Sequence, residues 1–398
     1  MTPSRGSEPV KLLHTSDWHV GKAMRGQSRA DEHEAVLAEI TGIAAAEAVD
    51  LILVTGDLFE TSAPSPESEA IVYRHLLGLA GTGAKVVVIA GNHDNPRRLA
   101  AVTPLLAPGQ VTLLAEPAKA AARGVVRFET PAGEAVNLAL LPFVSQRGIV
   151  KADDLMGRQA ADHAATYAER LRRLVEHLTA GLDAGDAVNL LAAHAMVSGG
   201  TLGGGERSAH TIFQYALPAG AFPASLTYLA LAHSPRTQQV PGAACPAWYP
   251  GSPLALDFGE EEDRKAVLVV EVGAGLPASV RTVPLTAGRA LRTVRGTVDD
   301  LRALAGDVGD DWLRVVVDEP ARAGLAEEVR ALLPNAVQVS ARPVEAEDGA
   351  PRAVRLGRSP DELFAEYLAE RDVEDPRLLT LFGELHDELS DPEAEDAA

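Results

Sequence analysis

The chain contains one cysteine, Cys245, among 398 residues, which excludes an intrachain disulfide and fits a reducing compartment. It lacks any apolar run near the ~18 residues that a membrane-spanning helix needs, and its N-terminus lacks the apolar stretch of a signal peptide. We therefore expect a soluble, cytoplasmic protein with no membrane partner. The phosphate-binding pattern G-x-x-x-x-G-K-[ST] is also absent, so the glycine-rich stretch Thr201–Arg207 (TLGGGER) is interpreted as a loop and not as an ATP site.

Positive charge is scarce as well. The sequence has 36 lysines and arginines against 56 aspartates and glutamates, which gives a net charge of -20. Because duplex DNA is bound mainly through basic side chains, this composition argues against a nucleic-acid partner. Net charge does not decide the matter, however, because metal ions offset acidic side chains at a site. A local basic groove or a second subunit can also supply positive charge.

Three apolar runs in the first quarter of the chain each predict a buried strand that ends in polar residues. They are Lys11–His19 (KLLHTSDWH), Leu51–Glu60 (LILVTGDLFE) and Lys85–Asp94 (KVVVIAGNHD). In the second run, Gly56 lets the backbone turn and Asp57 follows at the carboxyl end of the strand. Open α/β sheets hold ligands at this end of their strands. One such aspartate is more often a turn residue or a helix cap, but three polar strand ends in succession favour a site.

The side chains after these strands suit a metal ion. Carboxylate, imidazole and amide groups are donors for Mn²⁺, Fe or Zn²⁺. Alternate residues of an extended segment point the same way, so Asp17 and His19 can hold one ion together. Asp57 then stands between this pair and the Asn92-His93 pair.

Two later strands end in histidine. The run Ala187–Ala193 precedes His194, and the run Leu226–Ala232 precedes His233. An isolated histidine at such a position is more often a structural residue than a ligand.

The order D-x-H, G-D and G-N-H-D, each after a strand, resembles the calcineurin-type metallophosphoesterases. The stretches HTSDWHVGK, GDLFE and GNHD are similar to the SbcD family, the nuclease subunits of bacterial SbcCD complexes, and the similarity runs from about Val10 to the last helices. The resemblance implies an α/β fold. We expect a layered metallophosphoesterase sandwich of two mixed β-sheets flanked by helices, with a small α+β capping domain and a C-terminal helical pair.

The same resemblance implies two divalent metal ions, with Mn²⁺ expected. Matched residue by residue, the first ion falls to Asp17, His19 and Asp57. The second falls to Asp57, Asn92, His194 and His233, so Asp57 bridges the two. His93 is expected to protonate the leaving oxygen or to stabilise the transition state, and by either route it is the catalytic residue.

The chain departs from the family at one position. The family pattern there is G-H-x-H, whereas this chain reads Ala232-His233-Ser234-Pro235. Pro235 has no ligating atom in its side chain and stands where the fourth protein ligand of the first ion belongs. We therefore expect weakened occupancy of the first metal position.

The chain is predicted to divide into five parts. These are a nuclease domain (1–285), a capping domain (286–343), a linker (344–358), a helix-loop-helix (359–390) and a disordered tail (391–398). Apolar patterning from Leu291 to Ala341 predicts the element order β-α-β-α-β. The apolar pattern of the last helices fits packing on their own domain as well as docking on a partner, and the resemblance favours docking on an SbcC-like ATPase.

The leading hypothesis is a DNA nuclease subunit that forms a homodimer within a complex with an SbcC-like ATPase and serves DNA repair, recombination and replication. Family resemblance implies 3'-5' exonuclease action on double-strand ends and endonuclease action on single strands or hairpins. Two alternatives remain at this point. One is a phosphodiesterase of small nucleotides on the same core, and the other is a catalytically weak scaffold for the ATPase, which Pro235 favours.

Overall fold

The computed structural model describes residues 9–118, 124–145, 160–182, 185, 187–198 and 216–342, together with 364–365, 367–368, 377–379 and 381–382. The chain divides into two compact units, Met1–Arg342 and Pro343–Ala398. The expected linker, the expected tail and the loop Thr201–Arg207 lie outside the described residues. Within the expected helical pair, the described residues are helical, and the rings of Phe364 and Phe382 stack with their centroids 4.2 Å apart.

The first unit contains a six-stranded sheet in the order β12-β11-β1-β2-β3-β4. Strands β1 to β4 run parallel, and β11 and β12 extend the sheet beyond β1 in antiparallel fashion. The strands are β1 (Val10–Thr15), β2 (Leu51–Val54), β3 (Lys85–Ile89), β4 (Val111–Leu114), β11 (Ala266–Val272) and β12 (Ser279–Pro284). The sheet is therefore mixed, with its parallel part carrying the three predicted polar strand ends.

A second six-stranded sheet has the order β5-β6-β7-β8-β10-β9. Strands β6, β7, β8 and β10 run parallel, while β5 and β9 are antiparallel edge strands. The strands are β5 (Val125–Glu129), β6 (Ala135–Leu141), β7 (Val188–His194), β8 (Tyr228–Ala232), β9 (Gln238–Gln239) and β10 (Ala247–Tyr249). The short connection between β5 and β6 leaves no room for a crossover helix, which explains their antiparallel pairing.

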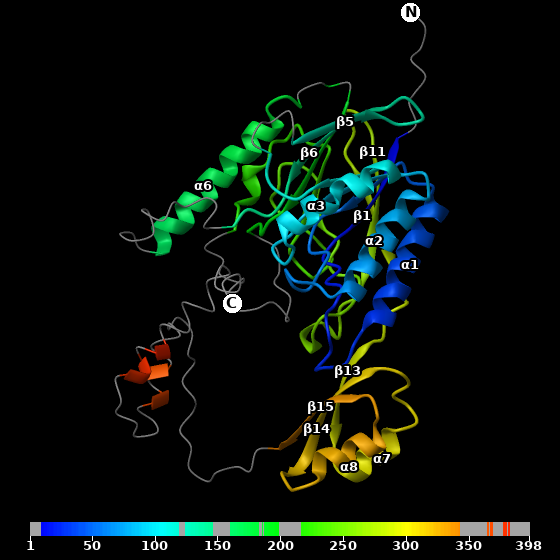
Figure 1. Cartoon of the computed structure of the whole chain (residues 1–398), viewed down its shortest axis with the longest axis vertical. Coiled ribbons are helices and arrows are strands. Elements are labelled where there is room, and N and C mark those ends of the chain that lie inside the picture. The colour runs from blue at the N-terminus through cyan, green and yellow to red at the C-terminus, as the bar shows by residue number, and fades with distance from the viewer. Residues whose placement is uncertain are drawn as a thin grey trace, which may run out of the picture. The chain divides into compact units, whose positions relative to one another are not determined.

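Helices cover the outer faces of the two sheets. Helices α1 (Ala30–Glu47), α2 (Pro66–Ala80) and α3 (Pro96–Leu106) belong to the first sheet, and α6 (Ala160–Thr179) lies on the opposite side of the molecule in Figure 1. One buried cluster fills the space between the sheets, and two others fill the spaces between each sheet and its helices. The predicted layered α/β sandwich of two mixed sheets is confirmed.

Strand β2 shows why the central strands are continuously apolar. Ile52 and Val54 pack toward the helices, whereas Leu51 and Leu53 pack toward the other sheet. Both faces are buried, so no polar residue is tolerated until the strand ends.

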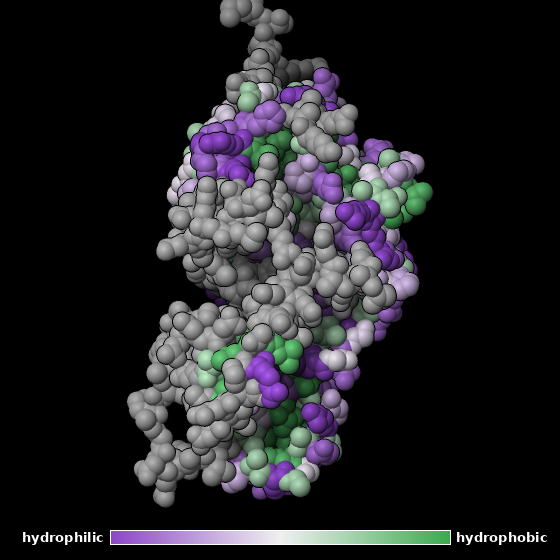
Figure 2. Space-filling model, turned by 60° about the vertical axis from the view of Figure 1, so that its left-hand side comes forward, coloured by the Kyte–Doolittle hydropathy of each residue, from purple (hydrophilic) through white to green (hydrophobic). Residues whose placement is uncertain are grey.

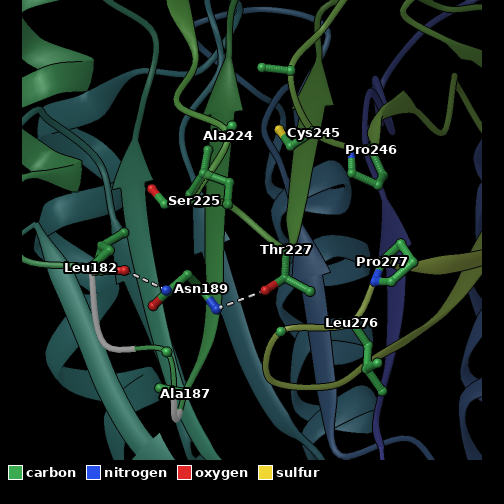
Figure 3. Close-up of a pocket in the computed structure, with 14 residues that line it drawn as sticks. Leu182, Ala187, Asn189, Ala224, Ser225, Thr227, Cys245, Pro246, Leu276 and Pro277 are labelled. Carbon is green, nitrogen blue, oxygen red and sulfur yellow. Dashed lines mark hydrogen bonds between the residues drawn. The ribbon is translucent and has the colours of Figure 1, made fainter.

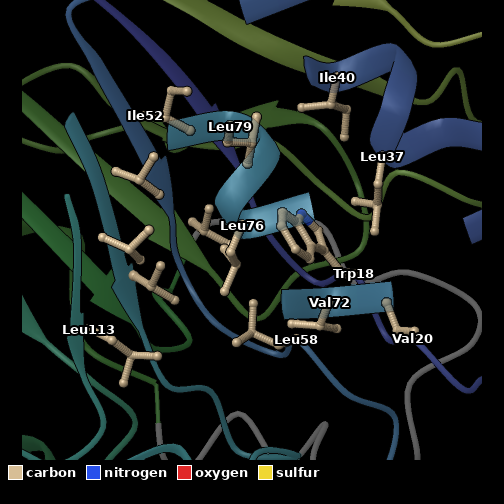
Figure 4. Packing of buried hydrophobic residues seen from close by; sticks show 14 of the residues in the cluster. Trp18, Val20, Leu37, Ile40, Ile52, Leu58, Val72, Leu76, Leu79 and Leu113 are labelled. Atoms are coloured by element: carbon tan, nitrogen blue, oxygen red, sulfur yellow. The ribbon is translucent and has the colours of Figure 1, made fainter. Parts of the chain in front are cut away.

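The helical side of the first sheet also fixes the loop after β1. Trp18 lies within the apolar cluster around Val72 and Leu76 and is 1% exposed (Figure 4). Its indole Nε1 donates to Thr15 Oγ1 over 3.1 Å. Because Trp18 separates Asp17 from His19, burial of the indole holds both polar side chains in place.

Side-chain caps mark the starts of two helices. The Ser65 side chain accepts a hydrogen bond from the Ser68 amide and caps α2, and Asn95 caps α3 in the same way. A proline occupies the first position of each helix. Helix α1 ends at Glu47, because Ala48 adopts a left-handed conformation with φ 50°.

A smaller three-stranded parallel sheet, in the order β13-β14-β15, completes the first unit. Its elements are β13 (Leu291–Gly296), α7 (Val298–Leu304), β14 (Trp312–Pro320), α8 (Leu325–Leu332) and β15 (Ala336–Arg342). The predicted β-α-β-α-β order is confirmed, and the two helices and the sheet share one apolar cluster. The domain boundaries at 285 and 343 stay predictions.

A buried polar contact joins the small sheet to α1. The Glu32 carboxylate accepts hydrogen bonds from Trp312 Nε1 at 2.8 Å, Arg289 N at 2.9 Å and Arg29 Nη2 at 2.8 Å. Glu32 is 7% exposed, so its charge depends on these donors. The contact fixes the small sheet against the larger sandwich.

Among the described residues, no helix combines the length and apolar character needed to cross a bilayer. The described surface visible in Figure 2 has hydrophilic and hydrophobic areas side by side.

Candidate metal centre

All seven predicted site residues gather at the carboxyl ends of five strands. Three strands, β1, β2 and β3, come from the first sheet, and two, β7 and β8, come from the second. The residues that follow or end them are Asp17, His19, Asp57, Asn92, His93, His194 and His233. The predicted convergence of separate parts of the chain is therefore observed in the structure.

Asp57 lies in the middle of this group. Its Oδ1 accepts a hydrogen bond from the His93 amide at 2.8 Å, and its Oδ2 lies 3.7 Å from His19 Nε2 and 3.5 Å from His194 Nε2. The residue is 2% exposed. Burial alone would raise the pKa of Asp57, but the surrounding imidazoles, that of His194 foremost, lower the pKa to about 2. Asp57 is therefore an anion that several imidazoles surround.

The backbone at the site is strained. The φ angles of Asp17, His19 and Asp57 are 51°, 48° and 52°, and that of His233 is 101°. Residues other than glycine rarely adopt such angles, and they cluster at functional sites. The strain turns these side chains inward at the ends of their strands.

Two glycines allow the strand ends to approach closely. A Cβ atom on Gly91 would lie 2.1 Å from Asp57 Oδ1, and a Cβ atom on Gly56 would lie 2.4 Å from His194 Nδ1. Neither position therefore tolerates a side chain without displacing a predicted ligand.

Acceptor atoms converge on the side of the second sheet. His194 Nδ1 lies 2.9 Å from the Thr55 carbonyl oxygen, to which it donates, so Nε2 is the ring nitrogen that faces the site. That Nε2 lies 2.9 Å from Asn92 Oδ1, which in turn lies 2.7 Å from His233 Nδ1. An imidazole nitrogen, an amide oxygen and the Asp57 carboxylate that face one another fit a divalent cation.

The other side of Asp57 is built by His19, His93 and Asp17. His19 Nδ1 lies 2.9 Å from Glu60 Oε2, and His93 Nδ1 lies 2.7 Å from the Glu60 carbonyl oxygen. Burial works against protonation of His19, but the Glu60 hydrogen bond and the Asp57 and Asp17 carboxylates together raise the pKa of His19. Burial also raises the pKa of Asp17 to about 6, with a further contribution from Asp57, and a bound cation would reverse both effects.

Two sets of three donors each have their ligand atoms within 4.8 Å of one another among the described residues. One set is Asp57, His194 and His233, and the other is His19, Asp57 and His93. The second set contains His93, which the sequence predicts to be catalytic, and does not contain Asp17, which it predicts to be a ligand. Asp17 instead accepts the His233 amide at 3.2 Å and the Ser16 hydroxyl. The roles of these residues stay predictions.

Three neighbouring residues position the site and were not singled out from the sequence. Glu60 and Thr55 contact imidazoles, as described above, and Asp94 connects two loops. Asp94 accepts the Gly91 amide at 2.8 Å and the Phe59 amide at 3.1 Å. Asp94 and Glu60 stand inside the quoted motifs GNHD and GDLFE, but their spacing alone does not reveal which groups they contact.

Pro235 is buried next to the site. Its carbonyl oxygen accepts hydrogen bonds from Ser252 N and from Lys265 Nζ, both at 3.1 Å. Gly251, with φ 78°, passes so closely that a Cβ atom there would lie 2.7 Å from this oxygen. The backbone at position 235 is thus fixed, while its side chain offers no donor.

A separate pocket of about 400 Å³ lies at the opposite, amino ends of β7, β8 and β10 (Figure 3). Two of its polar residues, Asn189 and Thr227, are engaged in hydrogen bonds. Asn189 donates its side-chain amide to the Leu182 carbonyl oxygen and its backbone amide to Thr227 Oγ1. None of the predicted site residues lines this pocket, and its described lining does not indicate a ligand.

Known proteins match the chain in two regions. Residues 10–137 match the Calcineurin-like phosphoesterase family, and residues 287–372 match the SbcD_C family, described as Type 5 capsule protein repressor C-terminal domain. The first match covers β1 to β3 and therefore the motifs of five of the seven site residues. The second covers the small three-stranded sheet.

Three bacterial relatives, each named as an SbcD-type component of the nuclease SbcCD, match most of the chain. The protein from Bacillus subtilis (strain 168) is 35% identical over 286 residues, which are 71% of each chain. The one from Rhodobacter capsulatus is 31% identical over 294 residues, 69% of each chain. The one from Escherichia coli (strain K12) is 28% identical over 313 residues, 78% of this chain and 76% of its own.

Proposed function

Because the chain belongs to the SbcD family of nuclease subunits, we propose that the residues gathered around Asp57 form its active site. The chain is a metal-dependent phosphodiesterase of the nuclease class. The observation that carries the proposal is the place of Asp57, whose carboxylate lies within 3.7 Å of two imidazoles from different sheets. A carboxylate in that position suits the bridge between two cations.

Asp17, His19 and Asp57 hold the first ion in this proposal, and Asp57, Asn92, His194 and His233 hold the second. Mn²⁺ is the proposed metal, since carboxylate, amide and imidazole donors together suit it. When bound, such ions lower the pKa of a water molecule and neutralise charge that grows on phosphate oxygens. The chain's own contribution is to hold the donors and to turn their lone pairs inward.

His93 has the catalytic role in the proposal. Its amide donates to Asp57 and its Nδ1 lies against the Glu60 carbonyl, so Nε2 faces the site. Burial lowers the pKa of His93, and the nearby His19 lowers it further. A ring held in this way can stabilise the phosphate or assist the leaving oxygen, which is typically worth ~10² to 10⁴ in rate.

DNA and an SbcC-like ATPase are the proposed partners, in a complex that contains two copies of this chain in the cytoplasm. Two basic side chains near the site are engaged with acids: Lys22 with Glu60, and Arg98 with Glu69. With a net charge of -20, we infer that the ATPase supplies much of the basic surface for DNA. Exonuclease action on double-strand ends and endonuclease action on hairpins remain part of the proposal.

A phosphodiesterase of small nucleotides is not favoured, because the SbcD_C match at 287–372 adds a part that a small substrate does not need. A weakly catalytic scaffold stays as the other alternative, because Pro235 offers no ligand to the first ion. The test below includes it as one outcome.

The test is a Mn²⁺ titration of the chain, with and without the ATPase subunit, on linear duplex DNA and on bis-p-nitrophenyl phosphate. We expect metal-dependent hydrolysis of both, and a loss of at least ~100-fold in Asp57→Asn. Asp307→Asn, at an exposed position of the small sheet region, is the matched control and should behave as the parent. Cleavage by Asp57→Asn at the parental rate would overturn the proposal. Hydrolysis of the small ester alone would favour the small-nucleotide enzyme, and no hydrolysis at any Mn²⁺ concentration would favour the scaffold.

A further inference from the structure

Glu60 touches two site histidines with two different groups. Its carboxylate oxygen Oε2 lies 2.9 Å from His19 Nδ1, and its main-chain carbonyl oxygen lies 2.7 Å from His93 Nδ1. The two rings meet edge to face with their centroids 4.7 Å apart. One residue of the loop after β2 therefore contacts both rings.

These contacts also determine which nitrogen of each ring faces the site. An imidazole that donates its Nδ1 proton to an oxygen keeps the lone pair on Nε2. In His19 that Nε2 points toward Asp57 Oδ2, 3.7 Å away. The ring is thus set in the tautomer that a metal ligand needs.

Glu60 is itself held in place. Its second carboxylate oxygen, Oε1, accepts a hydrogen bond from Lys22 Nζ at 2.8 Å, and the Glu60 side chain is 14% exposed. The ammonium group compensates the carboxylate charge and leaves Oε2 directed at His19. The chain Lys22–Glu60–His19 is therefore a continuous series of hydrogen bonds that ends at the metal position.

We propose that Glu60 is a positioning residue of the nuclease site, whose carboxylate orients His19 for the first metal ion and whose carbonyl orients His93 for catalysis. The inference rests on the proposed function. The orientation of His19 matters most at the first metal position, because Pro235 brings no donor there and the ion depends on fewer ligands.

The two groups of Glu60 can be separated by mutation. Glu60→Ala removes the carboxylate but keeps the carbonyl, so it should disturb His19 and spare His93. We expect the dissociation constant of the weaker Mn²⁺ position to rise ~10- to 100-fold, with the stronger position unchanged. DNA cleavage should recover at high Mn²⁺, because the catalytic histidine is still in place. Glu60→Gln keeps an acceptor for His19 Nδ1 and should show a smaller rise.

Mn²⁺ binding is measured by isothermal titration and by electron paramagnetic resonance on the full chain, so the readout does not depend on activity. Glu34→Ala is the matched control, because Glu34 makes the same kind of contact with His75, 2.7 Å away, between α1 and α2. It should bind Mn²⁺ as the parent does. If Glu60→Ala does not fold, Glu60→Gln and Lys22→Met must each still weaken the first position.

The outcomes separate the two proposals. Unchanged Mn²⁺ affinity at both positions in the Glu60 variants, with Asp57→Asn losing both ions, would overturn the role of Glu60 alone. Unchanged binding in Asp57→Asn would overturn the metal centre itself. A rate loss in Glu60→Ala that high Mn²⁺ does not restore would contradict positioning of a ligand.

Discussion

Asp57 Oδ2 and His194 Nε2 lie 3.5 Å apart, although Asp57 follows β2 in one sheet and His194 ends β7 in the other. Both residues are buried, with exposed fractions of 2% and 1%. The sandwich thus brings an anion and an imidazole from separate layers to one point at its edge. The geometry suits a shared cation better than a direct hydrogen bond, because the distance exceeds the usual range.

Pro235→His should strengthen the first metal position. The backbone at 235 is held by Lys265 and Ser252, so a histidine introduced there would start from a fixed place. We expect the Mn²⁺ concentration for half-maximal cleavage to fall ~10- to 100-fold. Metal stoichiometry and the cleavage rate at limiting Mn²⁺ are the measurements. Equal occupancy and equal rates in the two proteins would show that a histidine at this position is dispensable.

His93→Gln should separate catalysis from metal binding. We expect both Mn²⁺ ions to remain while DNA cleavage falls ~10²- to 10⁴-fold, because the ring acts on the phosphate. Stoichiometry is measured by titration and cleavage with linear duplex DNA. Loss of one equivalent of Mn²⁺ would instead make His93 a ligand, as its grouping with His19 and Asp57 within 4.8 Å allows.

Gly91→Ala should damage the site through packing alone. The added Cβ atom would meet Asp57 Oδ1 at 2.1 Å, so the loop must shift, at a cost of about 1–3 kcal/mol in the free energy of unfolding. Mn²⁺ binding should fall with it. Gly42→Ala is the control, because no atom lies within 4 Å of its added Cβ, and in α1 it should stabilise the protein by about 0.5–1 kcal/mol. Urea denaturation measures the stability of both variants. Equal stability of Gly91→Ala and Gly42→Ala would contradict the close approach of Gly91 to Asp57.

Lys265→Met should destabilise the fold. Lys265 Nζ donates a hydrogen bond to Glu260 Oε2, 2.5 Å away. Glu260 lies in the loop before β11, and its side chain is fully buried. Removal of the ammonium group leaves a buried carboxylate unpaired, which costs about 3–5 kcal/mol. The double variant Lys265→Met/Glu260→Leu should recover part of the loss. Denaturant midpoints measure the free energy of unfolding. A value for Lys265→Met within about 1 kcal/mol of the parent would contradict the expected loss.

His33→Leu should flatten the pH dependence of stability. Burial, helped by the nearby Arg29 charge, lowers the pKa of His33 from 6.5 to about 4. The unfolded chain therefore binds a proton at higher pH than the folded chain does, so stability is lost as pH falls from 6.5 toward 4. The loss amounts to roughly 3 kcal/mol for this one group. Unfolding curves between about pH 7 and about pH 4, recorded in EDTA, measure this loss of stability, and the two pKa values set the pH range. Parallel pH profiles for the parent and the variant would show that His33 does not titrate in this way.

Local sequence was enough to predict the elements that carry the site. The run LILV before Gly56 forms β2 because both faces of the strand are buried, and Asp57 follows directly. Helix α2 begins at Pro66 because Ser65 caps it. The order of elements from Leu291 to Arg342 follows from apolar periodicity in the same way.

Contacts between distant residues could not be predicted in this way. Nothing near β1 shows that β11, which begins at Ala266, pairs with it, because strand pairing depends on the whole sheet. The same holds for Glu60, whose two contacts with His19 and His93 exist only once the loops after β1, β2 and β3 lie side by side.

The sequence by itself determined which side chains stand at the strand ends, because strand formation and termination depend on neighbouring residues. Only the tertiary structure decided that Asp57 faces His194 and that Glu60 orients two rings. The reason is physical: apolar burial selects the layers, but the distances between ends of different strands are set by sheet order, by the strained turns and by glycines such as Gly91 that let them approach.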